Sequence, residues 1–502
     1  MTQVPDYISK GWKTSFWKIS LLAVWAIAFW PVAGNASSGD TIEFCLNGEF
    51  DLGVRLQGMQ PSAGEFSAAS WCVITEDGSD RVHFQIGGRS NPDTTGKFAV
   101  SYLPPDVIRI VNRESPPDIE FPGAEITFEA MRHRRIDPLR LVEEFLDHPE
   151  WLVSEPGGGW REVRYPGSKF IVRLWIDEGK LYSLVTFVDL PLRGRVPVRW
   201  EWAWVPPGEP SLSFYLDGEV IFEASGSRRV LDADEAAALW EPSPGPEPME
   251  APAEFWPARV RMQLETLAEG VYVVRGVRNG FHHLVVDTDE GLVIGDAPAG
   301  WVELPQIPPA DLVPGLGVSG LSEKLIDFLA EELPGRPIRA VALTHAHDDH
   351  AGGARAFAAA GAEVYAPAEM SAFLSAALNQ AEMPSDRLSE SGGEVEVFSV
   401  SDRVRLDDDE NAVELLNIGS GPHVSSSLGV WAVDAGYFFQ SDLHVPNSED
   451  EVPRSDRFLT ECWFAQWAVR HLPPETIVLN SHSLVVTPVS RLARYLESEG
   501  CQ

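Results

Sequence analysis

The sequence THAHDDHAGG, residues 344–353, says more about this chain than any other stretch, and it directly follows the apolar run 341–343. Histidines two residues apart at the end of a buried strand can turn toward one ion, and an Asp-His pair just behind them can face a second. Imidazole and carboxylate donors suit zinc, and a catalytic zinc site keeps one position open for water. The candidate ligands here are His345, His347, Asp349 and His350. The competing interpretation is an acidic loop with chance histidines, which so dense a cluster after an apolar strand disfavours.

The pattern HxHxDH resembles the hallmark of the metallo-β-lactamase superfamily, and the resemblance covers about residues 260–502. Members of that family carry further ligands at the ends of later strands. Here the matching positions imply two ligand groups around one carboxylate: His345, His347 and His423 on one ion, Asp349, His350 and His482 on the other, and Asp442 between them. Asp296, in LVIGDAP, resembles the family's early-strand aspartate, which supports the site without binding metal.

This resemblance implies an α/β fold, an αββα sandwich, and a hydrolase that holds two zinc ions. Such ions produce a hydroxide that attacks an ester, thioester, lactone or amide bond, and they polarise the oxygen of that bond. Asp349 is the catalytic candidate, because its carboxylate can orient the hydroxide or pass a proton to the leaving group. Ser481 stands where many relatives have glycine, and Pro422-His423-Val424 differs from the loop typical of true β-lactamases. Both departures weaken the expectation of a lactam substrate.

Two other functions stay open at the level of the sequence. One is an iron-dependent sulfur oxidoreductase of the same fold, resembling persulfide dioxygenases, in which a single iron uses two histidines and one aspartate. The full set of second-site ligands favours two metal ions, although ligand type alone does not exclude iron. The other is a periplasmic protein that binds a lipid-like ligand in its first domain, with the metal domain as an accessory.

The N-terminus predicts a cleavable export signal spanning residues 1–36, with an uncleaved anchor as the alternative. Three lysines precede the apolar run 19–33, which ends near small residues and is shorter than the ~20 residues of a membrane span. We therefore expect a periplasmic or secreted protein with no stable membrane insertion once the signal is cleaved. The formal net charge of −36 argues against a nucleic-acid partner, because phosphate binding relies on lysine and arginine. A small-molecule substrate is the expected partner.

Residues 37–240 predict a mainly antiparallel β domain with one or two helices. In VPVRWEWAWV, Trp200, Trp202 and Trp204 share one face of a strand, which we interpret as core rather than as a ligand groove. A hairpin turning at Asp217-Gly218 and a helix capped by Asp137 before a proline fit the same pattern. This region resembles the half-barrel of periplasmic lipoprotein carriers. The proline-rich stretch 241–257 predicts an extended linker, and the catalytic domain is expected to occupy 258–502.

The remaining cysteines and histidines give weaker expectations. Cys45 and Cys72 lie in the first domain and Cys462 and Cys501 in the second, so an oxidising compartment would permit one disulfide in each. His282 and His283 are expected to line the pocket without binding metal, and the loop 299–320 to overhang the site. His83, His133 and His148 are expected at the surface or in structural roles, whereas His444 and His471 are expected at the surface.

Overall fold

The computed structural model describes residues 41–50, 71–75, 82–85, 98–103, 107–112, 119–122, 137–164, 170–204, 209–240, 249–250, 262–277, 281–299, 318–380, 386–406, 411–446, 458–483, 485–497 and 501. The chain divides into two compact units, Met1–Ser37 and Ser38–Gln502, and all described residues belong to the second. The predicted signal segment and most of the loop 299–320 therefore lie outside the described residues. Among the described residues, no helix is long and apolar enough to cross a membrane.

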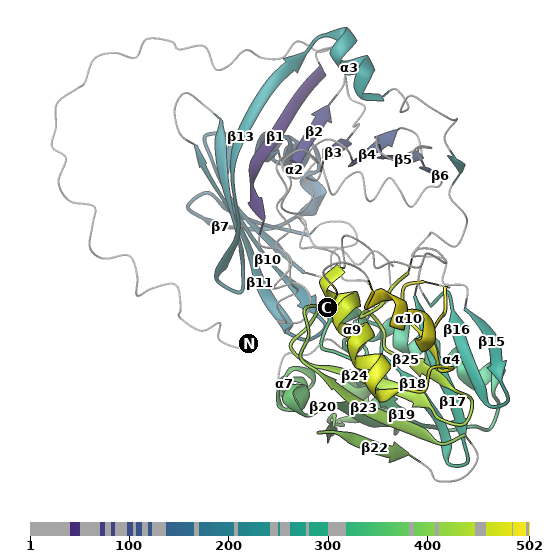
Figure 1. Ribbon diagram of the computed structural model, residues 1–502. Coiled ribbons are helices and arrows are strands. Elements are labelled where there is room, and N and C mark those ends of the chain that lie inside the picture. The colour runs from purple at the N-terminus through teal and green to yellow at the C-terminus, as the bar shows by residue number, and fades with distance from the viewer. Residues whose placement is uncertain are drawn as a thin grey trace, which may run out of the picture. The chain divides into compact units, whose positions relative to one another are not determined.

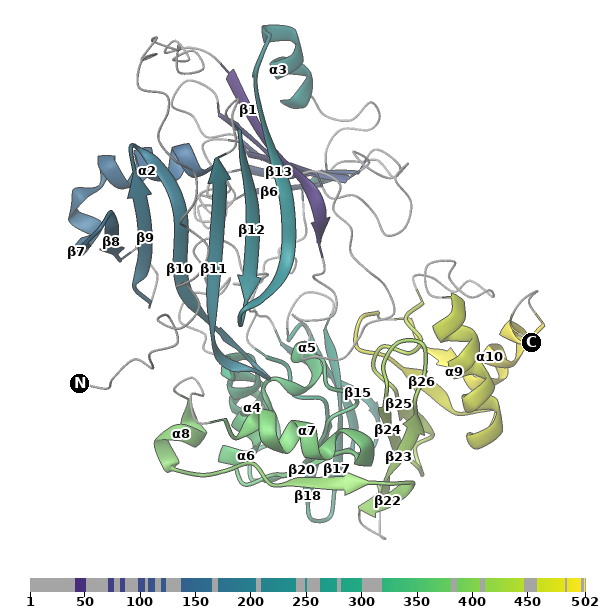
Figure 2. The same cartoon turned by 90° about the vertical axis from the view of Figure 1, so that its left-hand side faces the viewer.

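The N-terminal region forms a nine-stranded antiparallel sheet in the order β2-β1-β13-β12-β11-β10-β9-β8-β7 (Figure 2). It also forms a five-stranded sheet in the order β14-β6-β5-β4-β3. The strands are β1 (Thr41–Phe50), β2 (Trp71–Thr75), β3 (Val82–Gln85), β4 (Phe98–Leu103), β5 (Val107–Asn112), β6 (Ile119–Pro122), β7 (Leu152–Gly157), β8 (Trp160–Val163), β9 (Val172–Asp177), β10 (Lys180–Leu190), β11 (Gly194–Trp204), β12 (Pro210–Leu216), β13 (Glu219–Leu231) and β14 (Met249–Glu250). The short strand β14 lies within the stretch predicted as linker and pairs in parallel with β6.

Alternation of side chains explains how the large sheet forms its core. Along β11 the buried positions recur at every second residue, and Trp200 and Trp202 are 1% and 2% exposed. The tryptophan-rich face is therefore core, as predicted. The β12–β13 hairpin turns at Asp217 and Gly218, both with positive φ as a type I′ turn requires. The helices of this region are α2 (Pro138–Asp147), with Asp137 as its N-cap, the 3₁₀ turn η2 (Pro149–Trp151) and α3 (Ala233–Trp240).

The C-terminal region contains a seven-stranded sheet ordered β15 to β21 and a six-stranded sheet ordered β22 to β27 (Figure 1). The first comprises β15 (Gln263–Ala268), β16 (Val271–Arg275), β17 (His282–Thr288), β18 (Gly291–Gly295), β19 (Ile338–Ala342), β20 (Glu363–Pro367) and β21 (Val397–Val400). The second comprises β22 (Arg403–Leu406), β23 (Val413–Gly419), β24 (Ser427–Ala432), β25 (Tyr437–Phe439), β26 (Ile477–Leu479) and β27 (Thr487–Pro488).

Three apolar clusters arrange these sheets and their helices in four layers. One cluster joins residues such as Val285 and Val341 of the seven-stranded sheet to Leu325 and Phe357 of the helices outside it. A second lies between the two sheets, and a third joins the six-stranded sheet to the last two helices. The helices are α4 (Gly320–Glu332), α5 (Asp348–Ala351), α6 (Ala354–Ala359), α7 (Ala368–Leu378), α8 (Arg387–Ser391), α9 (Phe458–His471) and α10 (Val489–Tyr495). This is an αββα sandwich, as the sequence predicted.

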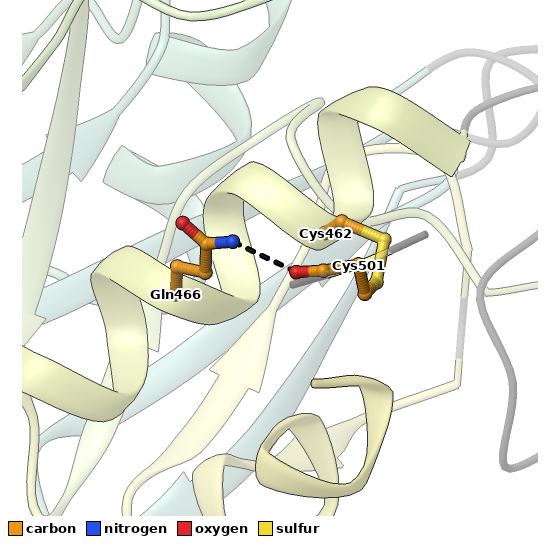
Figure 3. Close-up of a disulfide and its surroundings, with 3 residues drawn as sticks. All are labelled: Cys462, Gln466 and Cys501. Atoms are coloured by element: carbon orange, nitrogen blue, oxygen red, sulfur yellow. Dashed lines mark hydrogen bonds between the residues drawn. A yellow bond between two sulfur atoms is a disulfide. The ribbon is translucent and has the colours of Figure 1, made fainter. Parts of the chain in front are cut away.

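A disulfide fastens the end of the chain to helix α9. Cys462 of α9 is bonded to Cys501, and Nε2 of Gln466 donates a hydrogen bond to the carbonyl oxygen of Cys501 at 2.8 Å (Figure 3). Cys45 is also disulfide-bonded, and it stands opposite Cys72 in the β1–β2 register. Disulfide-bonded cysteines thus occur in both regions, which is the possibility that the sequence left open.

Candidate metal centre

The seven predicted ligands come from four places in the αββα sandwich. The segment that begins at His345 follows β19, and three single ligands, His423, Asp442 and His482, follow β23, β25 and β26. The turn at the end of β19 leads directly into the short helix α5, whose first turn carries Asp349 and His350. The ends of four strands and the start of helix α5 therefore bring these side chains together at one place. They do so although His482 lies more than a hundred residues after His345.

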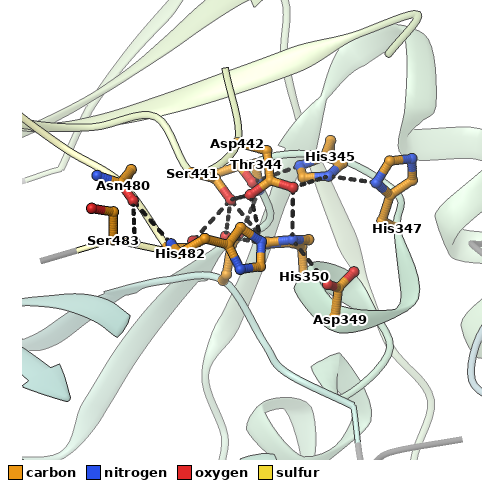
Figure 4. A network of polar contacts seen from close by, with 12 residues as sticks. Thr344, His345, His347, Asp349, His350, Ser441, Asp442, Asn480, His482 and Ser483 are labelled. Atoms are coloured by element: carbon orange, nitrogen blue, oxygen red, sulfur yellow. Dashed lines mark hydrogen bonds and ion pairs between the residues drawn. The ribbon is translucent and has the colours of Figure 1, made fainter. Parts of the chain in front are cut away.

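The first group of donors contains His345, His347, His423 and Asp442, whose potential ligand atoms all lie within 4.8 Å of one another. Nε2 of His345 and Nδ1 of His347 are 2.9 Å apart (Figure 4). Two nitrogens bound to one tetrahedral zinc ion at ordinary bond lengths would be roughly 3.3 Å apart. The pair is thus close to the geometry that a shared ion requires.

The second group contains Asp349, His350 and His482, again with donor atoms within 4.8 Å. Nε2 of His350 lies 3.4 Å from Oδ2 of Asp349. The ring of Phe281 meets the ring of His482 edge-on, with centroids 4.4 Å apart, and thereby restricts that ring. Sequence reasoning did not identify Phe281, because its contact with His482 depends on the tertiary fold.

Asp442 faces both groups. Its Oδ1 lies 2.9 Å from Nε2 of His482, and its Oδ2 lies 3.3 Å from Nε2 of His350 and 3.4 Å from Nε2 of His423. The carboxylate therefore reaches histidines of both groups at once, which is the arrangement expected of a bridging ligand.

The protonation preferences of the first group suit a metal ion. Burial lowers the pKa of His345 well below its usual value and that of His347 to about 3. Burial would raise the pKa of Asp442, but His350 and His482 hold it well below the ordinary value. Neutral imidazoles beside an ionised carboxylate are the forms that bind metal.

Unpartnered nitrogens give a second test of whether a metal fits. Among the described residues, the buried Nε2 atoms of His350 and His423 have no hydrogen-bond partner; each has only a longer contact to Oδ2 of Asp442, at 3.3 and 3.4 Å. Buried polar atoms normally have a hydrogen-bond partner. A cation bound between these two nitrogens and the carboxylate of Asp442 would give both nitrogens a partner. The residues present therefore fit one or two metal ions.

The ligand rings have partners on their outer side. Nδ1 of His345 lies 3.0 Å from Oγ1 of Thr344, and Nδ1 of His350 lies 2.9 Å from Oδ2 of Asp296. Oδ1 of Asp296 accepts a hydrogen bond from the backbone N–H of Thr344 at 2.8 Å. Asp296 is fully buried and stands behind His350, outside both donor groups, in the supporting place that the resemblance implied. Such partners fix the tautomer and the orientation of a ligand ring.

The side chains differ in their access to solvent. His345, His347 and His350 are at most 2% exposed, whereas the side chains of Asp349 and His482 are 22% and 25% exposed. The two donor groups are therefore most open to solvent on the side of Asp349 and His482.

The other predicted histidines have mixed outcomes. His282 and His283 are 7% and 0% exposed and belong to neither donor group; Nδ1 of His283 lies 2.9 Å from the carbonyl oxygen of Gly295. The expected surface position of His471 is confirmed, since it is exposed and stacks on Trp467. His83 and His133 lie outside the residues whose side chains are described.

The expectation for His444 was wrong. This residue is 1% exposed, its Nε2 lies 3.0 Å from Oγ1 of Thr487, and its Nδ1 lies 3.5 Å from Oε1 of the buried Glu461. Its ring meets Tyr495 edge-on. The polar sequence around His444 suggested a surface loop, but helices α9 and α10 supply Glu461 and Tyr495, which cover it.

An αββα sandwich with histidine and aspartate donors at its strand ends defines a class of metal-binding α/β domains. Residues 314–482 match the family model of the metallo-beta-lactamase superfamily, so this part of the chain is a metallo-β-lactamase-fold domain.

Among solved structures, the metallo-beta-lactamase from Pontibacter korlensis is 18% identical with a TM-score of 0.34, over 47% of this chain and 98% of that one. The metallo-beta-lactamase from Hirschia baltica is 16% identical with a TM-score of 0.32, over 47% of this chain and 96% of that one. No curated protein matches the chain.

Proposed function

We propose that this protein is a metal-dependent hydrolase that cleaves an ester, thioester, lactone or amide bond. The observation that carries the proposal is the convergence of seven His and Asp side chains in two donor groups, with Asp442 between them. Two bound zinc ions would lower the pKa of a bound water molecule and would polarise the bond to be cleaved.

The chain's own residues divide the remaining work between them. The buried histidines hold their positions through Thr344 and Asp296, so the donor groups exist before a substrate arrives. Asp349 is partly exposed on the accessible side, where its carboxylate can orient the attacking water or carry a proton toward the leaving group. Asp349 is therefore the residue to which we assign proton handling.

One observation separates this proposal from an iron-dependent sulfur oxidoreductase with a single ion. A mononuclear site needs three donors, whereas the described residues offer a second complete group in Asp349, His350 and His482. The test is elemental analysis of the purified protein together with hydrolysis of small esters, thioesters, lactones and amides. Zinc with metal-dependent hydrolysis supports the proposal, while one iron per chain without hydrolysis would replace it with sulfur oxidation.

We also propose that the protein is exported to the periplasm or beyond and acts there on a small molecule. The apolar segment 19–33 after three lysines supports export, and the Cys462–Cys501 disulfide is consistent with an oxidising compartment. Fractionation of expressing cells tests this: the protein should appear in the periplasmic or extracellular fraction, shortened at its N-terminus. Recovery of the full-length chain from the cytoplasm would contradict it.

A further inference from the structure

Two buried serines each stand immediately before a predicted metal ligand. Ser441 precedes Asp442, Ser481 precedes His482, and both serines are fully buried. Their Oγ atoms lie 3.0 Å apart, and the backbone N–H of Ser481 donates to the carbonyl oxygen of Ser441 at 3.2 Å. The loops after β25 and β26, which carry ligands of both donor groups, are therefore joined at this pair.

The hydroxyl of Ser441 also reaches the residues that hold His350. It donates to Oδ2 of Asp296 at 2.9 Å. It also lies 2.9 Å from Nδ1 of His350 (Figure 4). Because Nδ1 of His350 is also 2.9 Å from the same Asp296 oxygen, the ring is held by a three-membered cluster of polar groups. The ring can turn only if it gives up two contacts at once.

The backbone makes serine an unexpected choice at position 441. Ser441 has a φ of 65° and its partner Asp296 a φ of 69°, in the left-handed region that disfavours residues with a Cβ. Glycine would adopt this conformation more easily, so the backbone alone does not account for a serine here. A hydroxyl with four polar neighbours does account for it: Asp296, His350, Asp442 and Ser481.

We propose that Ser441 and Ser481 are positioning residues, which lock the ring of His350 and couple the two ligand-bearing loops so that the second donor group is formed in advance. The inference rests on the proposed metal centre and adds a supporting pair that is absent from the HxHxDH pattern. The hydroxyl of Ser481 donates to Ser441, which in turn donates to Asp296, while Nδ1–H of His350 donates to the same carboxylate. Each serine hydroxyl thus donates its single hydrogen once, Ser481 to Ser441 and Ser441 to Asp296.

The test is the zinc affinity of each site in S441G, S481A and the double variant, measured by competition with a chromophoric chelator. Glycine adopts the positive φ without strain, and the change removes the whole CH2OH side chain, including the hydroxyl. We expect one of the two sites in S441G to weaken about 10- to 100-fold, the usual effect of losing an outer partner of a ligand, while the other stays within about threefold. The double variant should lose less than the product of the two single losses, because the serines act through one another.

The matched control is S427A, which removes a buried serine hydroxyl that has no hydrogen-bond partner among the described residues. It should leave both zinc affinities unchanged. Unfolding of the metal-free proteins supplies the second measurement: S441G should be no less stable than the parent. Two intact sites in S441G, or equal weakening of both together with a destabilised metal-free protein, would overturn the positioning role. Failure of the unmodified protein to bind zinc would instead overturn the proposed function.

Discussion

At the scale of single residues, the neighbours Asp348 and Asp349 are expected to behave differently. Burial is the main cause that raises the pKa of Asp348 well above its usual value, and the charge of Asp349 adds to it. Asp348 belongs to neither donor group. We predict that Asp349→Asn lowers kcat/KM at least about 100-fold, since losing a ligand should cost no less than losing an outer partner. Steady-state kinetics on any substrate found in the panel measures this.

Asp348→Asn is the matched control for that variant. An amide resembles the neutral acid that the raised pKa favours, so kcat/KM should change little. Equal losses in the two variants would mean that the charge of the acidic pair, rather than the ligand atom of Asp349, is what matters.

Gly353 shows how closely the metal-binding turn is packed. A Cβ at this position would lie 2.1 Å from Oγ of Ser322 and 2.3 Å from the carbonyl oxygen of Pro298, and the second neighbour cannot rotate away. We predict that Gly353→Ala lowers the free energy of unfolding by about 1–3 kcal/mol, as overpacking does. Denaturant titration measures the loss.

Gly393→Ala provides the comparison, because the new methyl group would meet mainly the flexible end of Leu388 at 2.7 Å. Its free energy of unfolding should stay close to that of the parent. If both variants were equally stable, the close packing around Gly353 would not contribute to the free energy of unfolding.

At the scale of elements, Asp386 joins helix α8 to helix α6. Its Oδ1 accepts a hydrogen bond from the backbone N–H of Ser389, and its Oδ2 accepts one from Nε of Arg355 at 2.6 Å. The side chains of the pair are 5% and 6% exposed. Removing one partner of such a pair leaves a buried, uncompensated charge, so Asp386→Asn should lower the free energy of unfolding by about 3–5 kcal/mol.

The same pair predicts a pH dependence. Burial would raise the pKa of Asp386, but hydrogen bonds from Arg355 and Ser389 outweigh it and lower the pKa below its usual value. A carboxyl with a lowered folded pKa stabilises the fold above its unfolded pKa of about 3.9, and this stabilisation is lost as the pH falls further. Between pH 5 and pH 3, the free energy of unfolding should therefore fall more steeply for the parent than for Asp386→Asn. Parallel profiles would contradict the assignment.

The disulfide between α9 and the end of the chain gives another prediction for an element. It closes a loop with a sequence separation of 39 residues. Cross-linking a loop of this length restricts the unfolded chain, so Cys501→Ser should lower the free energy of unfolding by roughly 2–4 kcal/mol. Equilibrium unfolding with and without reductant measures the effect: reductant should lower the stability of the parent further than that of the variant. A variant as stable as the oxidised parent would contradict it.

The sequence predicted elements well wherever a local signal was present. Asp137 before Pro138 predicted the start of α2, and period-two alternation predicted the buried face of β11. The HxHxDH pattern predicted four of the gathered residues, and the family resemblance predicted the other three: His423, Asp442 and His482. Ser441 escaped prediction because its role depends on Asp296, 145 residues away, and on a backbone angle that has no sequence signature. His444 escaped because the residues that cover it lie in α9 and α10.

At the scale of the whole molecule, the donor groups assemble from segments that span much of the C-terminal domain. His345 and His482 come from different sheets of the sandwich, so the centre exists only when both sheets are in place. A net charge of −36 disfavours binding of anionic polymers, which supports the proposed small-molecule substrate.

Whether the two donor groups hold metal is decided by the metal content of the purified protein, measured by elemental mass spectrometry beside that of His345→Ala and His482→Ala. We predict about two zinc ions per chain in the parent, since both donor groups are complete, and a marked loss in each variant. A parent protein that holds no metal after reconstitution with zinc would contradict the account.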